Sequence, residues 1–166
     1  MMPDLRPMTD PLAIYLNDHL AGSSAGLELF RRAASSAEGE RRSTLRRLSR
    51  EVEQDRNALL DIMARLEVPV RHYKVAAGWL GEKVGRFKPN GQLGGRAPLS
   101  ALIEAEAMLL GVRGKAAGWQ ALRIVASHDD RLLVDELDAL IARADSQLEV
   151  LEQIRREVAV EVFVAG

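Results

Sequence analysis

Three residues that can bind metal ions or exchange protons stand inside stretches whose other members are apolar. His19, Asp55 and Glu106 each occupy a position that helical spacing places among leucines and alanines. One imidazole with two carboxylates is an acceptable ligand set for iron, manganese or zinc. Without a metal, the same groups would form an internal polar cluster that needs an opposite charge. The sequence leaves both interpretations open.

The height of each residue along its helix tests whether the three can meet. If the connection between the first two helices is centred near residue 37, His19 lies 18 residues before it and Asp55 18 residues after it, so the two face each other at one level of the helix pair. If the third helix starts level with the second, Arg113 or Lys115 faces Asp55. We therefore favour an ion pair of Asp55 with Arg113 or Lys115, with His19 as a hydrogen-bond partner. Glu106 approaches Asp55 only in an up-down-up-down layout.

Four long helices must position these residues, because the prolines leave four long stretches free to be helical. We predict helices over about 10–35, 38–67, 98–126 and 129–160, with a crossover over 68–97. Three helix starts have recognisable caps: Asp10 before Pro11, Ser35 with Glu38 at capping-box spacing, and the polar run 127–130. The second helix has the clearest seam: Leu45, Leu48, Val52, Asp55, Leu59, Ile62 and Leu66.

Small residues fill the middle of the first helix, where residues 21–26 read Ala-Gly-Ser-Ser-Ala-Gly. Glycine lowers helix stability, so its presence needs a reason. We predict that a neighbouring backbone approaches closely there; space for a ligand is the alternative.

The crossover starts with a short amphipathic helix and ends in a glycine-rich loop. Its apolar face carries Tyr73, Ala77, Leu80, Val84 and Phe87, and its basic residues are Arg71, Lys74, Lys83, Arg86, Lys88 and Arg96. Such a segment can rest on an acidic protein or an anionic membrane surface. The alternative is that it packs over the bundle with its lysines in water.

This order of two short-linked helix pairs, a long crossover and inward carboxylates resembles the ferritin-like superfamily of four-helix bundles. The resemblance implies a di-iron or di-manganese centre with a Glu-x-x-His motif on each of two helices. The three histidines here are His19, His72 and His128, and none has a glutamate three positions earlier. The resemblance therefore concerns the architecture and not the ligands.

Composition narrows the function classes further. The 166 residues suit one domain, and the net charge of −1 argues against nucleic acid as a partner. The chain has no cysteine, which excludes thiolate chemistry, and no phosphate loop, nucleophile elbow or signal-peptide pattern is present. We expect a cytoplasmic, all-α, non-enzymatic bundle without a catalytic residue or cofactor, acting through protein interaction or self-assembly as a dimer. The alternative is a bundle that binds iron or manganese.

Overall fold

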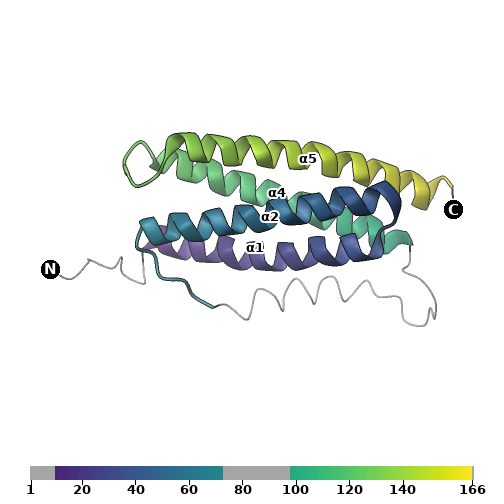
Figure 1. Cartoon of the computed structure of the whole chain (residues 1–166), viewed down its shortest axis with the longest axis horizontal. Helices are drawn as coiled ribbons and strands as arrows, with labels where there is room; N and C mark the ends of the chain where they lie inside the picture. The colour runs from purple at the N-terminus through teal and green to yellow at the C-terminus, as the bar shows by residue number, and fades with distance from the viewer. Residues whose placement is uncertain (1–9, 73–97, 166) are drawn as a thin grey trace.

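A computed structural model describes residues 10–72 and 98–165 of the chain. Four long helices make up most of these residues: α1 (Pro11–Ser36), α2 (Gly39–Arg65), α4 (Pro98–Val125) and α5 (Val134–Phe163) (Figure 1). The described ranges contain no strand. The prediction of an all-α protein with four long helices is confirmed.

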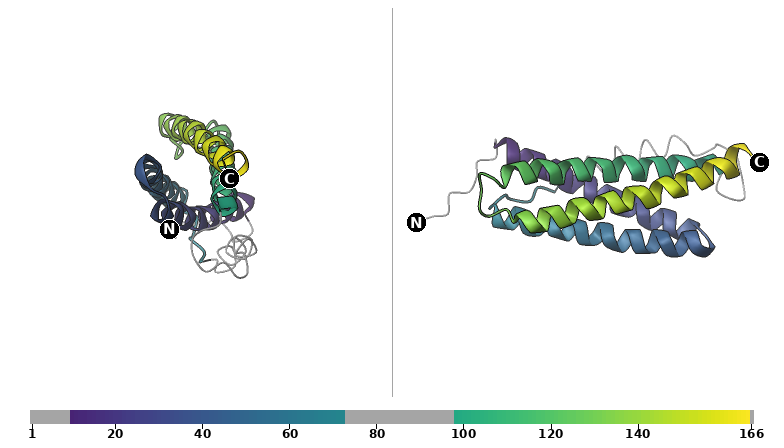
Figure 2. Two further views of the ribbon diagram at one scale, coloured as in Figure 1. Left: turned by 90° about the vertical axis from the view of Figure 1, so that its right-hand side faces the viewer. Right: turned by 90° about the horizontal axis from the view of Figure 1, so that it is seen from above.

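The four helices lie alongside one another, and their packing follows the order of the chain. Helix α1 packs on α2 and α4 packs on α5, while α1 also contacts α4 along part of its length. Figure 1 shows that α2 and α4 run in the same direction, and Figure 2 shows the bundle from its end and from above. Because α2 and α4 are parallel, residues near the middle of each helix come to the same level.

The start of α1 is the one predicted from the sequence. The Oδ1 atom of Asp10 accepts a hydrogen bond of 3.1 Å from the backbone N–H of Leu12, and Pro11 is the first helical residue. This side chain satisfies one of the N–H groups that a helix start leaves unpaired.

The predicted capping box of α2 is wrong. Helix α1 continues through Ser35 to Ser36, whose hydroxyls both donate to the carbonyl of Arg32. Glu38 precedes α2 without a side-chain capping bond, and Gly39 opens the helix with a φ of +54°. Glycine adopts a positive φ without the steric strain that a side chain would cause, so the turn at Gly39 decides where α2 begins.

The polar run 127–130 does not cap α5, which starts at Val134 and not near residue 129. Asp129 accepts instead from the backbone N–H of Arg131 at 3.1 Å and pairs with the guanidinium of the same residue. Leu132 is buried and holds this loop against the bundle. The pairing of Asp129 with Arg131 and the burial of Leu132 therefore make the connection between α4 and α5 longer than predicted.

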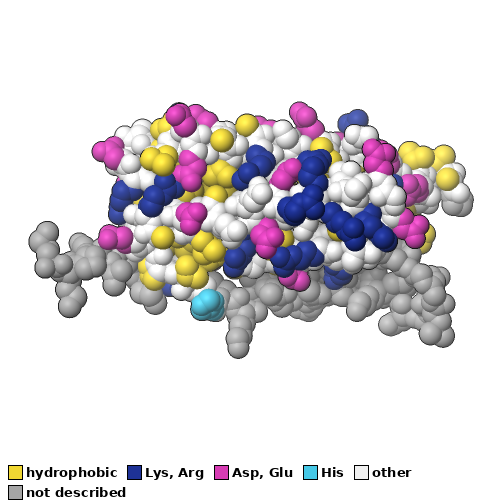
Figure 3. All heavy atoms as spheres, in the orientation of Figure 1, with side chains coloured by type: hydrophobic (Ala, Val, Ile, Leu, Met, Phe, Trp, Pro, Cys, Tyr) yellow, Lys and Arg dark blue, Asp and Glu magenta, His cyan; other side chains and the backbone are white. Residues whose placement is uncertain are grey.

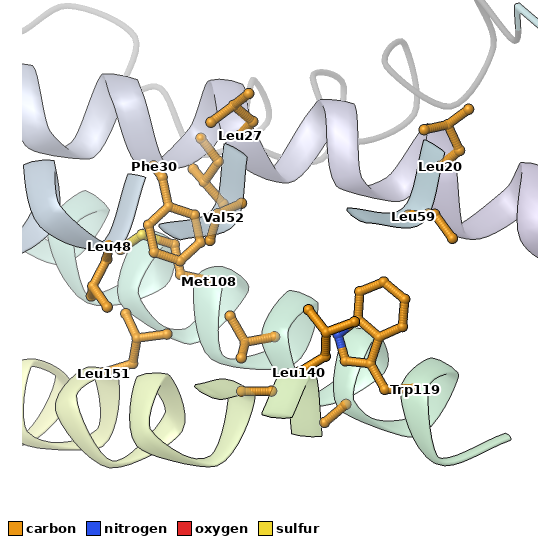
Figure 4. Close-up of a cluster of buried hydrophobic side chains, with 14 of the residues drawn as sticks. Leu20, Leu27, Phe30, Leu48, Val52, Leu59, Met108, Trp119, Leu140 and Leu151 are labelled. Atoms are coloured by element: carbon orange, nitrogen blue, oxygen red, sulfur yellow. The ribbon is translucent and has the colours of Figure 1, made fainter. Parts of the chain in front are cut away.

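The core runs through the middle of all four helices. The predicted seam of α2 is confirmed, since every one of its seven members is buried. Figure 4 shows part of this core, with Phe30, Leu48, Met108 and Leu151 among the side chains that meet between the helices. Burial of this kind contributes most of the stability of a bundle.

The predicted amphipathic helix and most of the basic crossover patch lie outside the described residues. The described residues include the start of the crossover, directly after α2. The amide of Asn17, which is buried, donates to the carbonyl of Pro69 at 3.0 Å and accepts from the backbone N–H of Arg71 at 2.7 Å. Asn17 therefore attaches the segment after α2 to α1.

The arginine-rich start of α2 forms ion pairs within the chain. Figure 3 shows basic side chains gathered over the right-hand half of α2. Arg41 donates to Glu161 of α5 at 3.1 Å, and Arg47 donates to Glu51 one turn later at 2.7 Å. Neighbouring carboxylates thus offset positive charge at a helix end where the macrodipole disfavours it. Within the described helices, no stretch is both long and apolar enough to cross a bilayer.

Candidate functional site

A network of charged and amide side chains crosses the interior of the bundle at the level of Asp55. Asp55 has only 1% of its surface exposed, and Lys115 of α4 donates to its Oδ2 atom. Arg143 of α5 donates to Oδ1 at 2.7 Å. Gln147 of α5 donates to Oδ2 at 3.2 Å and accepts from Lys115 at 2.5 Å. We call these four residues the Asp55 cluster.

Both oxygens of the Asp55 carboxylate are therefore occupied by donors from two other helices. Burial lowers the pKa of Lys115, and the neighbouring charge of Asp55 opposes this shift. An interior carboxylate is strongly unfavourable unless it is paired and hydrogen-bonded, and this one is both. The cluster joins α2, α4 and α5, although α2 and α5 make few other close contacts.

Of the two predicted partners of Asp55, Arg113 and Lys115, the structure shows Lys115 in contact with the carboxylate. Arg113 is exposed on α4, and Lys115 is the residue that faces the carboxylate. Two residues along a helix differ by about 200° in direction, so both cannot point inward. The pairing of Asp55 with Lys115 is the one that the height estimate gives for a third helix parallel to the second. The contribution of Arg143 and Gln147 was not predicted.

The sequence did contain a signal for Gln147. Leu140, Ala144, Gln147 and Leu151 follow one another at steps of four, three and four residues, and all four are buried. Leu148, which the apolar pattern favours as an inward residue, is only partly buried. Position along the helix, rather than residue type, indicates which side chain points inward.

His19 lines the same cavity as Asp55 but makes no hydrogen bond to its carboxylate. Its ring stacks edge-on against Tyr15, with 4.5 Å between the ring centroids, and rests on Gly118 of α4. A Cβ atom at Gly118 would come within 2.8 Å of Cε1 of His19. Burial lowers the pKa of His19, and the neighbouring charge of Asp18 partly opposes this.

Glu106 is exposed on α4. The three predicted ligands His19, Asp55 and Glu106 all line one cavity, but they do not gather into a metal site. Among the described histidines, aspartates and glutamates, no three are placed to hold one metal ion. Because the Asp55 oxygens already accept from Lys115 and Arg143, these residues do not fit a di-iron or di-manganese centre.

The cavity itself lies between α1 and α4 and reaches inward to α2. Its volume is 710 Å³, and most of its lining is apolar. Gly22 and Gly26 of α1 face it from one side, and Gly111 and Gly114 of α4 face it from the other. No described atom lies within 4 Å of a Cβ atom built on any of the four. In the described part of the chain, the predicted close backbone approach at residues 21–26 is therefore not found, and the glycines border open space.

One buried donor in this cavity lacks an acceptor. Trp119 lines the cavity and is 3% exposed, yet its indole N–H has no hydrogen-bond partner among residues 10–72 and 98–165. In Figure 4 its ring rises from α4 toward Leu59 of α2. The sequence placed Trp119 on the inward face of the third helix but gave no sign that its N–H is unpaired.

No family model, no curated protein and no solved structure matches this chain. The function must therefore be argued from the geometry of these residues.

Proposed function

We propose that this chain is a non-enzymatic helical bundle of the ferritin-like type that acts through self-assembly, as a twofold dimer formed by the outer face of α4. The ferritin-like assignment draws support from the parallel direction of α2 and α4 (Figure 1) and from the pairing of α1 with α2 and of α4 with α5. The assembly proposal depends on the surface of α4.

The observation that carries this proposal is an apolar strip on the outer face of α4. Leu110 is 73% exposed and Ile124 is 72% exposed, and single exposed side chains of this kind are common, so the argument depends on their forming one patch. At about 100° per residue, the direction of Leu110 is shared by Leu99, Ile103, Gly114, Ala117 and Ala121. We call these seven residues the α4 strip; it extends for about 38 Å. A long exposed apolar strip is typical of an interaction surface.

Two charges beside the α4 strip indicate that a second copy covers it. Glu106 and Arg113 are both exposed and lie seven residues apart along one edge of the strip. The charge of Glu106 also helps to raise the pKa of Arg155 of α5, so a partner's Arg113 would compete with an interaction inside the chain. In a twofold contact the same surface meets itself in the opposite direction. An axis passing near Leu110 would place Glu106 of each copy opposite Arg113 of the other, forming two reciprocal ion pairs.

Charge reversal tests this arrangement directly. We expect the wild-type chain to elute as a dimer in size-exclusion chromatography with light scattering. The variants Glu106→Arg and Arg113→Glu each replace two attractions by two repulsions, so each should weaken the dimer by about tenfold or more. The double variant exchanges the two charges and should restore the dimer. Glu149→Arg, on the exposed face of α5, serves as the control and should have no effect.

A wild-type chain that stays monomeric at tens of micromolar would refute the proposal, as would single variants that dimerise normally. A double variant that fails to recover would refute the antiparallel pairing of Glu106 with Arg113. The alternative function, iron or manganese binding, has no comparable support because Asp55 is already paired within the chain.

A further inference from the structure

We propose that the cavity between α1 and α4 binds an uncharged, elongated apolar molecule that carries one hydrogen-bond acceptor oxygen. A ketone, ester or alcohol on a hydrocarbon chain has this chemistry. The proposal concerns a site inside one copy of the chain. Ile103, Leu110 and Gly114 of the α4 strip also line this cavity, so the proposed dimer would cover its mouth, and the two proposals are tested by separate variants.

The size and lining of the cavity fit such a molecule. Small-molecule sites typically enclose 300–1,000 Å³ and are mainly apolar with a few polar groups, and this cavity has 710 Å³. Its inner walls are Leu16 and Leu29 of α1, Leu59 of α2, and Met108 and Leu122 of α4. These side chains offer a hydrocarbon chain the same environment as the core.

The glycines at the mouth keep this space open. Glycine inside a helix lowers stability relative to alanine, and alanine at Gly22, Gly26, Gly111 or Gly114 would meet no described atom. Packing among the described residues therefore gives no reason for glycine at these positions. Larger side chains here would point into the space between α1 and α4.

Trp119 supplies the second, independent observation. Within the described part of the chain, its indole N–H is a donor without an acceptor, and the Trp119 side chain is buried at the wall of an apolar cavity. Leaving a buried donor unpaired is unfavourable, and a ligand oxygen in the cavity would remove this deficit. The requirement is for an acceptor, because an indole N–H cannot accept.

The charges of the lining favour an uncharged ligand. Asp18 and Glu106 at the mouth carry negative charge, and Arg56 carries positive charge. Lys115, which reaches the cavity from α4, already pairs with Asp55 and Gln147. Among the described residues of the lining, no charged side chain is both buried and free to bind an ionised head group.

The test compares two probes of equal heavy-atom number, 2-undecanone and n-dodecane, by headspace gas chromatography over the full-length protein. We expect the wild-type chain to bind both. Trp119→Phe keeps an aromatic ring but removes the N–H, so it should weaken 2-undecanone binding by about fivefold while changing n-dodecane binding by less than about twofold. Gly114→Leu should weaken the binding of both probes, because its side chain takes up part of the space between α1 and α4. Ala142→Leu, on the exposed face of α5, is the control.

Several results would overturn the proposal. The proposal is refuted if the wild-type chain takes up neither probe. Equal losses for both probes in Trp119→Phe would remove the acceptor requirement. Uptake that is unchanged in Gly114→Leu would place the probes elsewhere. Repeating the measurement on Arg113→Glu separates this proposal from assembly, since a monomer should still bind the probes.

Discussion

Replacing Asp55 by asparagine should destabilise the protein severely, although the two side chains have nearly the same shape. The carboxylate is 1% exposed and accepts from Lys115, Arg143 and Gln147. The substitution leaves two cations facing each other in the interior, with the carboxylate of Glu51, which accepts from Gln147 at 3.2 Å, as the remaining negative charge beside them. Removing one partner of a buried ion pair costs about 3–5 kcal/mol. Because a third of the Arg143 side chain is exposed and can turn to water, we expect the lower end, about 3 kcal/mol.

This loss is large against a typical total stability of about 5–15 kcal/mol. With a urea m-value of about 2 kcal/mol per molar, the midpoint should fall by about 1.5 M in unfolding followed by circular dichroism at 222 nm. Glu53→Gln is the matched control on α2, because its ion pair with Arg31 is about half exposed; it should cost less than about 1 kcal/mol.

A second variant separates charge from packing. Asp55→Leu combined with Lys115→Met and Arg143→Met removes all three charges together, and it should recover most of the loss. An Asp55→Asn midpoint indistinguishable from the Glu53→Gln control would refute the reasoning, because the carboxylate would then contribute nothing beyond its shape. A triple variant less stable than Asp55→Asn would show that the cluster is itself stabilising.

Three further outcomes can be checked on the same protein. Gly118→Ala should be destabilising in the wild type, where its Cβ would meet the His19 ring at 2.8 Å, but stabilising by up to about 1 kcal/mol in a His19→Ala background; additive effects in the double-mutant cycle would contradict the contact. Burial lowers the pKa of His19, so the folded state binds fewer protons than the unfolded state, and stability should fall as the pH drops below about 6.5 toward the folded-state pKa. His19→Gln should reduce that pH dependence in urea unfolding, and an unchanged dependence would assign it to other groups. Protein purified without chelator and challenged with ferrous iron or manganese should carry substoichiometric metal by mass spectrometry; near-stoichiometric metal that is lost in His19→Ala would restore the metal-binding alternative.

Much of the fold could be predicted from local rules. Helical spacing of apolar residues identified four long helices, the Asp10 and Pro11 pair placed the start of α1, and the seam of α2 named its buried residues including Asp55. These features depend on backbone periodicity and on contacts within a few residues, which the order of the residues largely determines. The two wrong caps had a different cause. At Gly39 and Leu132, a left-handed turn and an apolar anchor outweighed plausible capping side chains.

The chemistry of the interior depended on the packing of the helices against one another. The direction of α4 and its rotation about its own axis decide which cation reaches Asp55. Lys115 does so because it points about 200° away from Arg113 around the helix. The unpaired N–H of Trp119 and the open space beside the glycines arise from the distance between α1 and α4. Sequence by itself determined the helices and the polar residues within them, because those depend on short-range periodicity. Only the tertiary structure decided which of these residues meet, because that depends on the relative placement of helices far apart in the chain.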